Sequence, residues 1–92
     1  MIRELIETIS ENDKKELIKI YERISSLEEL IIDVSKEKEE GLYSQIYNDL
    51  EKSNASINEW WTNIAHKYNL KFDEKGKWEL NFETNEVFLI IS

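Results

Sequence analysis

The residues with the most varied side-chain chemistry lie together in the stretch INEWWTNIAHKYNL, which begins at Ile57 and holds two tryptophans, the only histidine and a tyrosine. On a helix, the apolar residues of this stretch share one face with one of the two tryptophans, Trp60 or Trp61. Adjacent helical residues point about 100° apart, so we expect one indole in the core and the other at its boundary. The stretch is therefore predicted to be the inner face of a helix, with the boundary tryptophan as a candidate partner contact.

His66 has no second imidazole and no cysteine that could share a metal ion with it. A zinc site there would need carboxylates for every other ligand, and no serine lies in the glycine turn that exposes a nucleophile. Paired carboxylates, at residues 28–29 and 39–40, belong to a chain with twenty acidic residues, so neither pair indicates acid–base catalysis. Two isolated glycines make no phosphate-binding loop. We therefore expect a non-enzymatic protein without catalytic residues, metal or cofactor, and His66 at the surface or at a helix cap.

Length and charge restrict the class of protein further. Ninety-two residues with 40% hydrophobic content and no proline fit one domain spanning residues 1–92. A net charge of −8 argues against direct binding to nucleic acid or to an anionic membrane. No apolar run approaches the roughly twenty residues that cross a bilayer, and the charged N-terminal stretch is unlike a secretory signal. The absence of cysteine excludes disulfides and suits a cytoplasmic protein.

The first half of the chain is predicted to be helical. Ser10 reads as an N-cap followed by acidic residues, and apolar residues then recur every three or four positions, which predicts a helix over about 11–35. Residues 1–9 also have helical spacing, but the segment is short and is either a weak helix or an edge strand. The charged run 35–41 contains no apolar residue and predicts a solvated helix end followed by a loop.

The second half combines further helices with a hairpin. An apolar stripe predicts a helix over about 42–53, Ser53 and Asn54 then supply a break and a cap, and a last helix follows over about 55–69. Alternating residues predict strands at about 77–82 and 87–91, and the face formed by Trp78, Leu80 and Phe82 is expected to be buried. The turn between them holds Asn85, which tolerates a left-handed conformation. We therefore predict an α+β fold in which three to four helices form a small bundle with a C-terminal antiparallel β-hairpin packed on it.

Strand 87–91 is apolar at nearly every position, which implies cover on both faces. That cover is either the protein's own helices or a second copy, so a homodimer through strand 87–91 is possible. The edge of the strand after Val87 is also a candidate site for adding a peptide strand.

Short motifs along nearly the whole chain from Ser10 onward resemble those of the CXXX-repeat peptide modification system proteins. These are small accessory proteins encoded in bacteria beside radical SAM peptide-modifying enzymes and cysteine-repeat precursor peptides. The motifs are Ile20-Tyr21-Glu22-Arg23, Leu27-Glu28-Glu29-Leu30, Leu42-Tyr43, Asp49-Leu50, Glu59-Trp60-Trp61 with Lys67-Tyr68, Trp78-Glu79-Leu80-Asn81-Phe82-Glu83-Thr84 and Glu86-Val87-Phe88-Leu89.

The chain departs from that family's pattern at two positions. Asn69 and Leu70 follow Lys67-Tyr68 where an aromatic residue is expected, and Asn85 stands where the turn often carries a cysteine. The second departure removes any thiol chemistry from the turn. The family is not tied to a defined reaction, so the resemblance implies a partner class and transfers no catalytic position.

Two functional hypotheses follow, from different classes. The first is a non-enzymatic accessory or adaptor protein that binds a protein or peptide partner in a ribosomal-peptide modification system. The alternative is a phage-type inhibitor, an anti-defence protein whose acidic surface mimics nucleic acid. Whether that surface is functional or only solubilising stays open. The candidate partner-binding residues are Tyr43, Tyr47, Trp60, Trp61 and Phe88.

Overall fold

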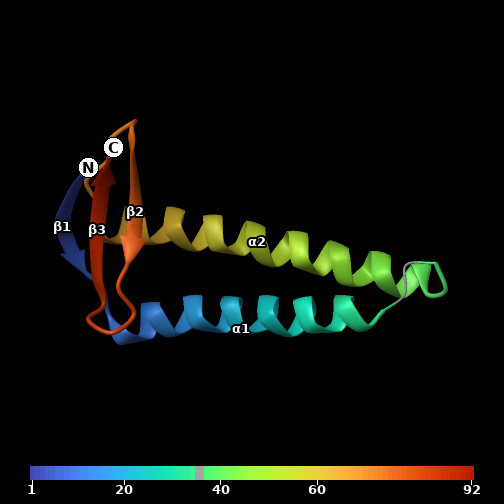
Figure 1. Ribbon diagram of the computed structural model, residues 1–92. Helices are drawn as coiled ribbons and strands as arrows, with labels where there is room; N and C mark the ends of the chain where they lie inside the picture. The colour runs from blue at the N-terminus through green and yellow to red at the C-terminus, as the bar shows by residue number, and fades with distance from the viewer. Residues whose placement is uncertain (35–36) are drawn as a thin grey trace. The chain divides into compact units, whose positions relative to one another are not determined.

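The computed structural model describes residues 1–34 and 37–92. In chain order these residues form β1 (Ile2–Thr8), α1 (Glu11–Asp33), α2 (Glu40–Tyr68), β2 (Gly76–Leu80) and β3 (Glu86–Ile91) (Figure 1). The chain divides into two compact units. We call residues 1–16 together with 61–92 the sheet unit, and residues 17–60 the helical unit.

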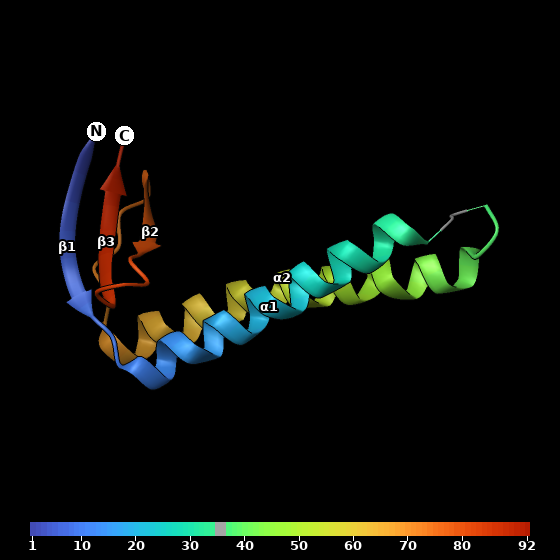
Figure 2. The same cartoon turned by 60° about the horizontal axis from the view of Figure 1, so that its bottom comes forward.

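The sheet unit is built on a three-stranded antiparallel sheet with the order β1-β3-β2. β3 lies between the other two strands in both views (Figures 1 and 2). Ile91 of β3 pairs with Ile2 of β1 on one side and with Gly76 of β2 on the other, which places the two ends of the chain beside each other. The register of β1 shifts between Leu5 and Glu7, where an extra residue forms an irregularity typical of a β-bulge.

The central position of β3 explains its apolar sequence. Val87, Leu89 and Ile90 are all buried within the single chain, at 0%, 1% and 7% exposure. Both edges of β3 are already paired, so the strand has no free edge for a peptide or a second copy. The predicted peptide site at the edge after Val87 is therefore wrong. The homodimer through strand 87–91 stays a prediction, because paired edges do not test whether a second copy covers a face of the strand. β1 and β2 are the edge strands of this sheet.

The helical unit is a pair of antiparallel helical segments that lie side by side (Figures 1 and 2). Their buried residues recur at spacings of three and seven, the stripe by which two helices pack along one seam. An ion pair between Arg23 and Asp49, at 3.7 Å, also joins the two segments, although both side chains are largely exposed and the pair adds little stability. Among the described residues of this unit, those that are buried are Leu17, Ile24, Leu27, Ile46, Ser53 and Trp60.

The class is α+β, but the predicted arrangement of three to four helices with a C-terminal hairpin is wrong, because the described residues form two helices and a three-stranded sheet. α2 runs unbroken through Ser53 and Asn54. Serine and asparagine each cost a helix interior only about 0.5–0.7 kcal/mol relative to alanine. Ser53 is buried on the same stripe as Ile46 and Trp60, at seven-residue spacing. The burial of this continuous stripe outweighs the weak local preference for a break.

Several predicted boundaries also change. Residues 2–8 form an edge strand rather than a weak helix, because pairing with the apolar β3 satisfies their backbone groups. α1 ends at Asp33 instead of residue 35, and residues 35–36 lie outside the described part of the chain. Gly41 belongs to the first turn of α2 and does not mark a helix end. Phe82 lies in the turn after β2 and is 41% exposed, so it is not part of the buried face.

Two asparagines adopt left-handed backbone conformations at chain reversals. Asn69 follows the last residue of α2 with φ 51°, and the Leu70 N–H donates to the Ala65 carbonyl at 3.0 Å, the pattern of a Schellman cap. Asn85 precedes β3 with φ 62°, which confirms the predicted left-handed residue in the hairpin turn. The side-chain oxygen of Asn81 accepts hydrogen bonds from the N–H groups of Glu83 and Thr84, at 2.9 and 3.3 Å, and so orders that turn.

Candidate partner-binding surfaces

A hydrogen-bond network around Asp13 fixes the start of α1 and the end of α2 inside the sheet unit. The Asp13 Oδ2 atom accepts hydrogen bonds from Ser10 Oγ at 2.8 Å, Lys67 Nζ at 2.8 Å and Tyr68 Oη at 2.6 Å. Ser10 Oγ accepts from the Asp13 N–H at 3.1 Å, which is an N-cap bond, and Tyr68 Oη accepts from the Ser10 N–H at 2.9 Å. Three side chains thus donate to one carboxylate oxygen, an arrangement that ties the two helix ends together.

The network shifts two pKa values. Burial alone raises the pKa of Asp13, but hydrogen bonds from Lys67, Tyr68 and Ser10 outweigh it and hold that pKa below the usual value. The hydrogen bond to Asp13 raises the pKa of Lys67, against a smaller opposing effect of desolvation. Both pKa shifts favour the charged form of the residue, so the ion pair between Asp13 and Lys67 is stabilised. The sequence signal that could have located half of this network is the Ser10-x-x-Asp13 spacing, which resembles a capping box.

An aromatic cluster joins α2 to β2 in the sheet unit. Trp61 stacks on Trp78 with ring centroids 5.9 Å apart and an interplanar angle of 24°. Phe72 approaches Trp78 edge-on, with centroids 6.4 Å apart at 62°. Trp78 also donates from Nε1 to the Lys71 carbonyl at 2.9 Å. The cluster holds Trp78 in one orientation and leaves Phe72 71% exposed.

A small pocket of about 100 Å³ opens beside this cluster. Phe72 and Trp78 provide aromatic walls, and Leu89 of the central strand also lines it. Gly76 keeps the space open, because a Cβ atom there would approach Leu89 Cδ1 to 2.9 Å and the Ile90 carbonyl oxygen to 3.2 Å. The remaining lining residues, Asp73 and Lys77, give the otherwise apolar pocket one charge of each sign.

The outer edge of β2 runs beside this pocket, and no strand among residues 1–34 and 37–92 pairs with it. The Asn81 N–H donates to the Glu86 carbonyl at 2.8 Å, so this pair is hydrogen-bonded across the hairpin. Backbone groups of an antiparallel strand point alternately toward and away from their partner strand. The N–H and C=O groups of Trp78 and Leu80 therefore point away from β3. They form an open edge of the kind that accepts an additional strand.

The other edge strand, β1, is less suited to pairing. Its irregularity between Leu5 and Glu7 interrupts the regular spacing of outward-pointing backbone groups. The Thr8 N–H already donates to the Glu7 side chain at 3.0 Å. Bulges and edge charges are devices by which natural sheets prevent further strand addition. β2, with five regularly paired residues, is the better template.

Phe88 lies on the sheet face away from Val87 and Leu89, since neighbouring residues of a strand point to opposite faces. The Arg3 guanidinium lies 3.8 Å from the centre of its ring, a cation–π contact, and pairs with Glu79 at 3.3 Å. β1 and β2 thus place charged side chains over this face of the central strand. Phe88 is partly buried beneath them and is a poor first contact for a partner.

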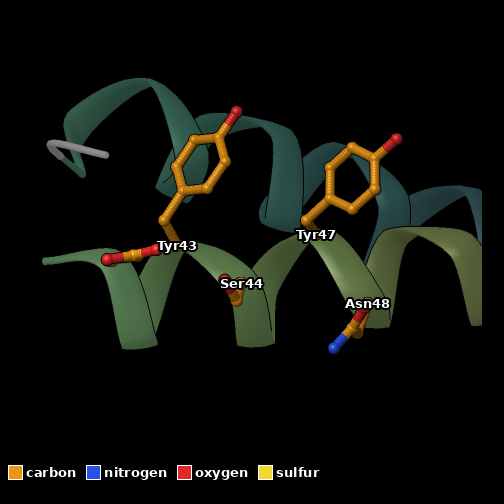
Figure 3. Close-up of a pocket in the computed structure, with 5 residues that line it drawn as sticks. Tyr43, Ser44, Tyr47 and Asn48 are labelled. Carbon is orange, nitrogen blue, oxygen red and sulfur yellow. The ribbon is translucent and has the colours of Figure 1, made fainter. Parts of the chain in front are cut away.

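Tyr43 and Tyr47 line a surface hollow of about 390 Å³ in the helical unit. Their rings stand on the same side of α2, one turn apart, with the hydroxyl groups at their outer ends (Figure 3). Glu40, Ser44 and Asn48 complete the lining. Tyr47 is 50% exposed and Tyr43 is partly buried.

The candidate contact residues are divided between the two units. Trp60 is 5% exposed and belongs to the core, whereas Trp61 is partly buried and stacks on Trp78. This confirms that one indole of the pair is core and the other lies at its boundary. Tyr43 and Tyr47 come together on one helix face, in the helical unit. The open edge of β2 and Phe72 were missed, although the hairpin pattern with an apolar residue just before it could have pointed to them.

Comparison with protein families, with curated proteins and with solved structures finds no match to the chain. His66 is exposed near the end of α2. Within the described residues, no group of three or more potential ligand side chains is placed to hold a metal ion. No helix in the described segments combines the length and apolar composition needed to cross a membrane.

Proposed function

We propose that the protein is a non-enzymatic accessory protein that binds an extended segment of a protein or peptide partner along the outer edge of β2. The observation that carries this proposal is the open edge at Trp78 and Leu80 directly beside the pocket formed by Phe72 and Trp78. The resemblance to CXXX-repeat peptide modification system proteins supports a precursor peptide or its modifying enzyme as the partner. In this proposal the protein acts in the cytoplasm.

The open edge of β2 and the pocket beside it contribute differently to binding: the edge holds the partner's backbone, and the pocket selects its side chains. Backbone hydrogen bonds to Trp78 and Leu80 would hold any extended segment, at about 0.5–1.5 kcal/mol each. The pocket selects among segments, because alternate side chains of an added strand point to the same face of the sheet. An apolar side chain of the partner fits against Phe72 and Trp78, and the charges of Asp73 and Lys77 set which polar groups flank it.

The experiment is a titration of the protein with a cysteine-repeat precursor peptide of the kind that the resemblance implies, followed by nuclear magnetic resonance of the backbone amides. We expect shifts concentrated at residues 72–80 and slowed exchange of the Trp78 and Leu80 amides. Replacement of Phe72 by alanine removes one exposed wall of the pocket and should weaken binding by roughly fivefold to thirtyfold, equivalent to about 1–2 kcal/mol.

Phe82→Ala is the matched control for Phe72→Ala. Phe82 is another exposed phenylalanine of the sheet unit, at 41%, and it does not line the pocket. The control should bind as the parent protein does. Equal loss in both variants, or no binding at tens of micromolar peptide and modifying enzyme, would falsify the proposal.

A further inference from the structure

The hollow on α2 has a lining that differs from the pocket beside β2. Its five residues recur at spacings of three and four, so they form one continuous face of a single helix. Two of them are tyrosines, Ser44 and Asn48 are polar and uncharged, and Glu40 carries a carboxylate. None of the five side chains carries a positive charge.

The surroundings of the hollow are strongly acidic. Residues 28–51 carry eight acidic and two basic side chains. Glu37 and Glu39, just before α2, are exposed, as is Glu40 at its first position. Such a concentration of one sign raises the local density of cations and repels nucleic acids and anionic lipids. The charge therefore favours a basic partner over an acidic one.

Exposed apolar side chains in the same unit indicate a macromolecular partner rather than a free cation. Leu42, the residue before Tyr43 in the chain, is 47% exposed, and Leu30 and Ile32 of α1 are 52% and 81% exposed. A protein surface that contacts these residues would bury apolar area that a small cation leaves in water. The acidic and apolar character together match an amphipathic basic segment.

We propose that the hollow formed by Tyr43, Tyr47 and Glu40 binds an arginine side chain presented by a basic segment of a partner protein. The planar guanidinium stacks on the face of an aromatic ring, pairs with a carboxylate and donates several hydrogen bonds at once. Tyr47 supplies the exposed ring, Glu40 the charge, and Ser44 and Asn48 are the polar residues of the lining. A lysine ammonium offers no planar face, so the site favours arginine over lysine.

This inference deepens the proposed function, on which it rests for the existence of a protein partner. It names the partner chemistry at a second surface, carried by the helical unit, while the strand-addition site lies in the sheet unit. An accessory protein that joins a peptide to an enzyme needs two such surfaces. The two sites involve different residues, so each can fail without the other.

The test uses the full chain and defined peptides. An acetylated, amidated peptide of alternating serine and arginine is titrated into the protein, in parallel with a peptide of the same sequence in which citrulline replaces arginine. Citrulline keeps the shape and removes the charge. We expect amide shifts centred on residues 40–48 with the arginine peptide, at a Kd of about 0.1–1 mM, and no such shifts with the citrulline peptide. A lysine version should bind several-fold more weakly.

Matched variants locate the binding. Tyr47→Leu and Glu40→Gln should each weaken the arginine peptide by about threefold to tenfold. Tyr21→Leu and Glu51→Gln are the controls, because they remove an exposed tyrosine and an acidic residue of the same unit that do not line the hollow. Circular dichroism confirms that the helices persist in all four variants.

Three results would overturn the inference. Shifts spread over the acidic residues of the whole chain, with Tyr47→Leu and Tyr21→Leu equally affected, would show diffuse charge attraction only. Equal binding of the citrulline peptide would remove the role of the guanidinium. Shifts confined to residues 72–80 would move the arginine contact to the strand-addition site and leave the proposed function intact.

Discussion

Trp61 of α2 and Trp78 of β2 stack face to face, with ring centroids 5.9 Å apart and an interplanar angle of 24°. This pair connects the last turns of α2 to an edge strand within the sheet unit, and it turns Trp78 so that its ring forms a wall of the pocket. A side chain that supports the fold here also shapes the candidate binding edge.

The stacked pair should be measurable as a coupling free energy. We expect Trp61→Ala and Trp78→Ala each to lower the free energy of unfolding by about 2–4 kcal/mol, since each loses a large packed ring. The double variant should lose about 0.5–1.5 kcal/mol less than the sum of the two, which is the energy of the ring pair itself. Urea unfolding of the four proteins gives this value. Simple additivity would show that the stacking adds nothing beyond burial.

Asp13 should control the acid stability of the sheet unit. Asp13→Asn keeps the shape and removes the charged acceptor, so we expect a loss of about 2 kcal/mol at neutral pH. The matched variant Tyr68→Phe removes one neutral hydroxyl from the same carboxylate and should cost about 1 kcal/mol. A control, Tyr47→Phe, loses an exposed hydroxyl in the helical unit and should change little. Chemical unfolding at pH 7 measures all three.

The pH dependence of that stability follows from the two shifted pKa values. The pKa of Asp13 is lower in the folded protein, so its contribution is present above the unfolded value of about 3.9 and is lost as pH falls through the folded pKa. The pKa of Lys67 is higher in the folded protein, so its contribution is present below about 10.4 and is lost as pH rises through the folded pKa. Asp13→Asn should therefore flatten both limbs of the stability profile.

Glu11 limits how far the acid limb flattens. Its pKa is also lowered, first by the hydrogen bond from Asn85 and then by that from Lys14. Asp13→Asn should therefore retain a residual acid dependence that decreases when Glu11→Gln is added. Thermal unfolding from about pH 2 to about pH 12 covers both limbs and tests this, and an unchanged profile in Asp13→Asn would count against the assigned role of the network.

A substitution in the middle of α2 can distinguish one continuous helix from two helices with a cap between them. Asn54 is exposed within the continuous helix, so Asn54→Ala should raise the free energy of unfolding by about 0.5 kcal/mol. If a new helix began after Ser53 and Asn54, loss of the capping side chain would instead lower stability by about 1 kcal/mol. Denaturant midpoints of Asn54→Ala and parent protein decide between these signs.

The left-handed residue Asn85 should tolerate only glycine well. Asn85→Ala places an ordinary L residue at φ 62° and should cost about 1–2 kcal/mol. Asn85→Gly relieves that strain and also removes Oδ1, a buried oxygen atom without a hydrogen-bond partner in the described structure, but it loses the donation to Glu11. We expect a melting temperature close to that of the parent for glycine and several degrees lower for alanine. Equal values would contradict the assigned backbone role.

The sequence alone predicted features that depend on neighbours along the chain. Ser10 begins α1 as a cap, Asn85 takes the left-handed position in the hairpin turn, and the Trp60-Trp61 pair divides between core and boundary. Each follows from local backbone preference or from the angle between adjacent helical residues. Such features need no knowledge of what the segment packs against.

Other features were decided by contacts between residues far apart in the chain. The segment 2–8 had an ambiguous period, and pairing with β3 some eighty residues later made it a strand. Ser53 and Asn54 favour a break locally, but one buried stripe through both halves of α2 made a single helix. The open edge of β2 and the grouping of Asp13 with Lys67 and Tyr68 also required the tertiary structure. A residue pattern records local period and polarity, whereas the choice of pairing partner depends on the free energy of burying two distant segments together.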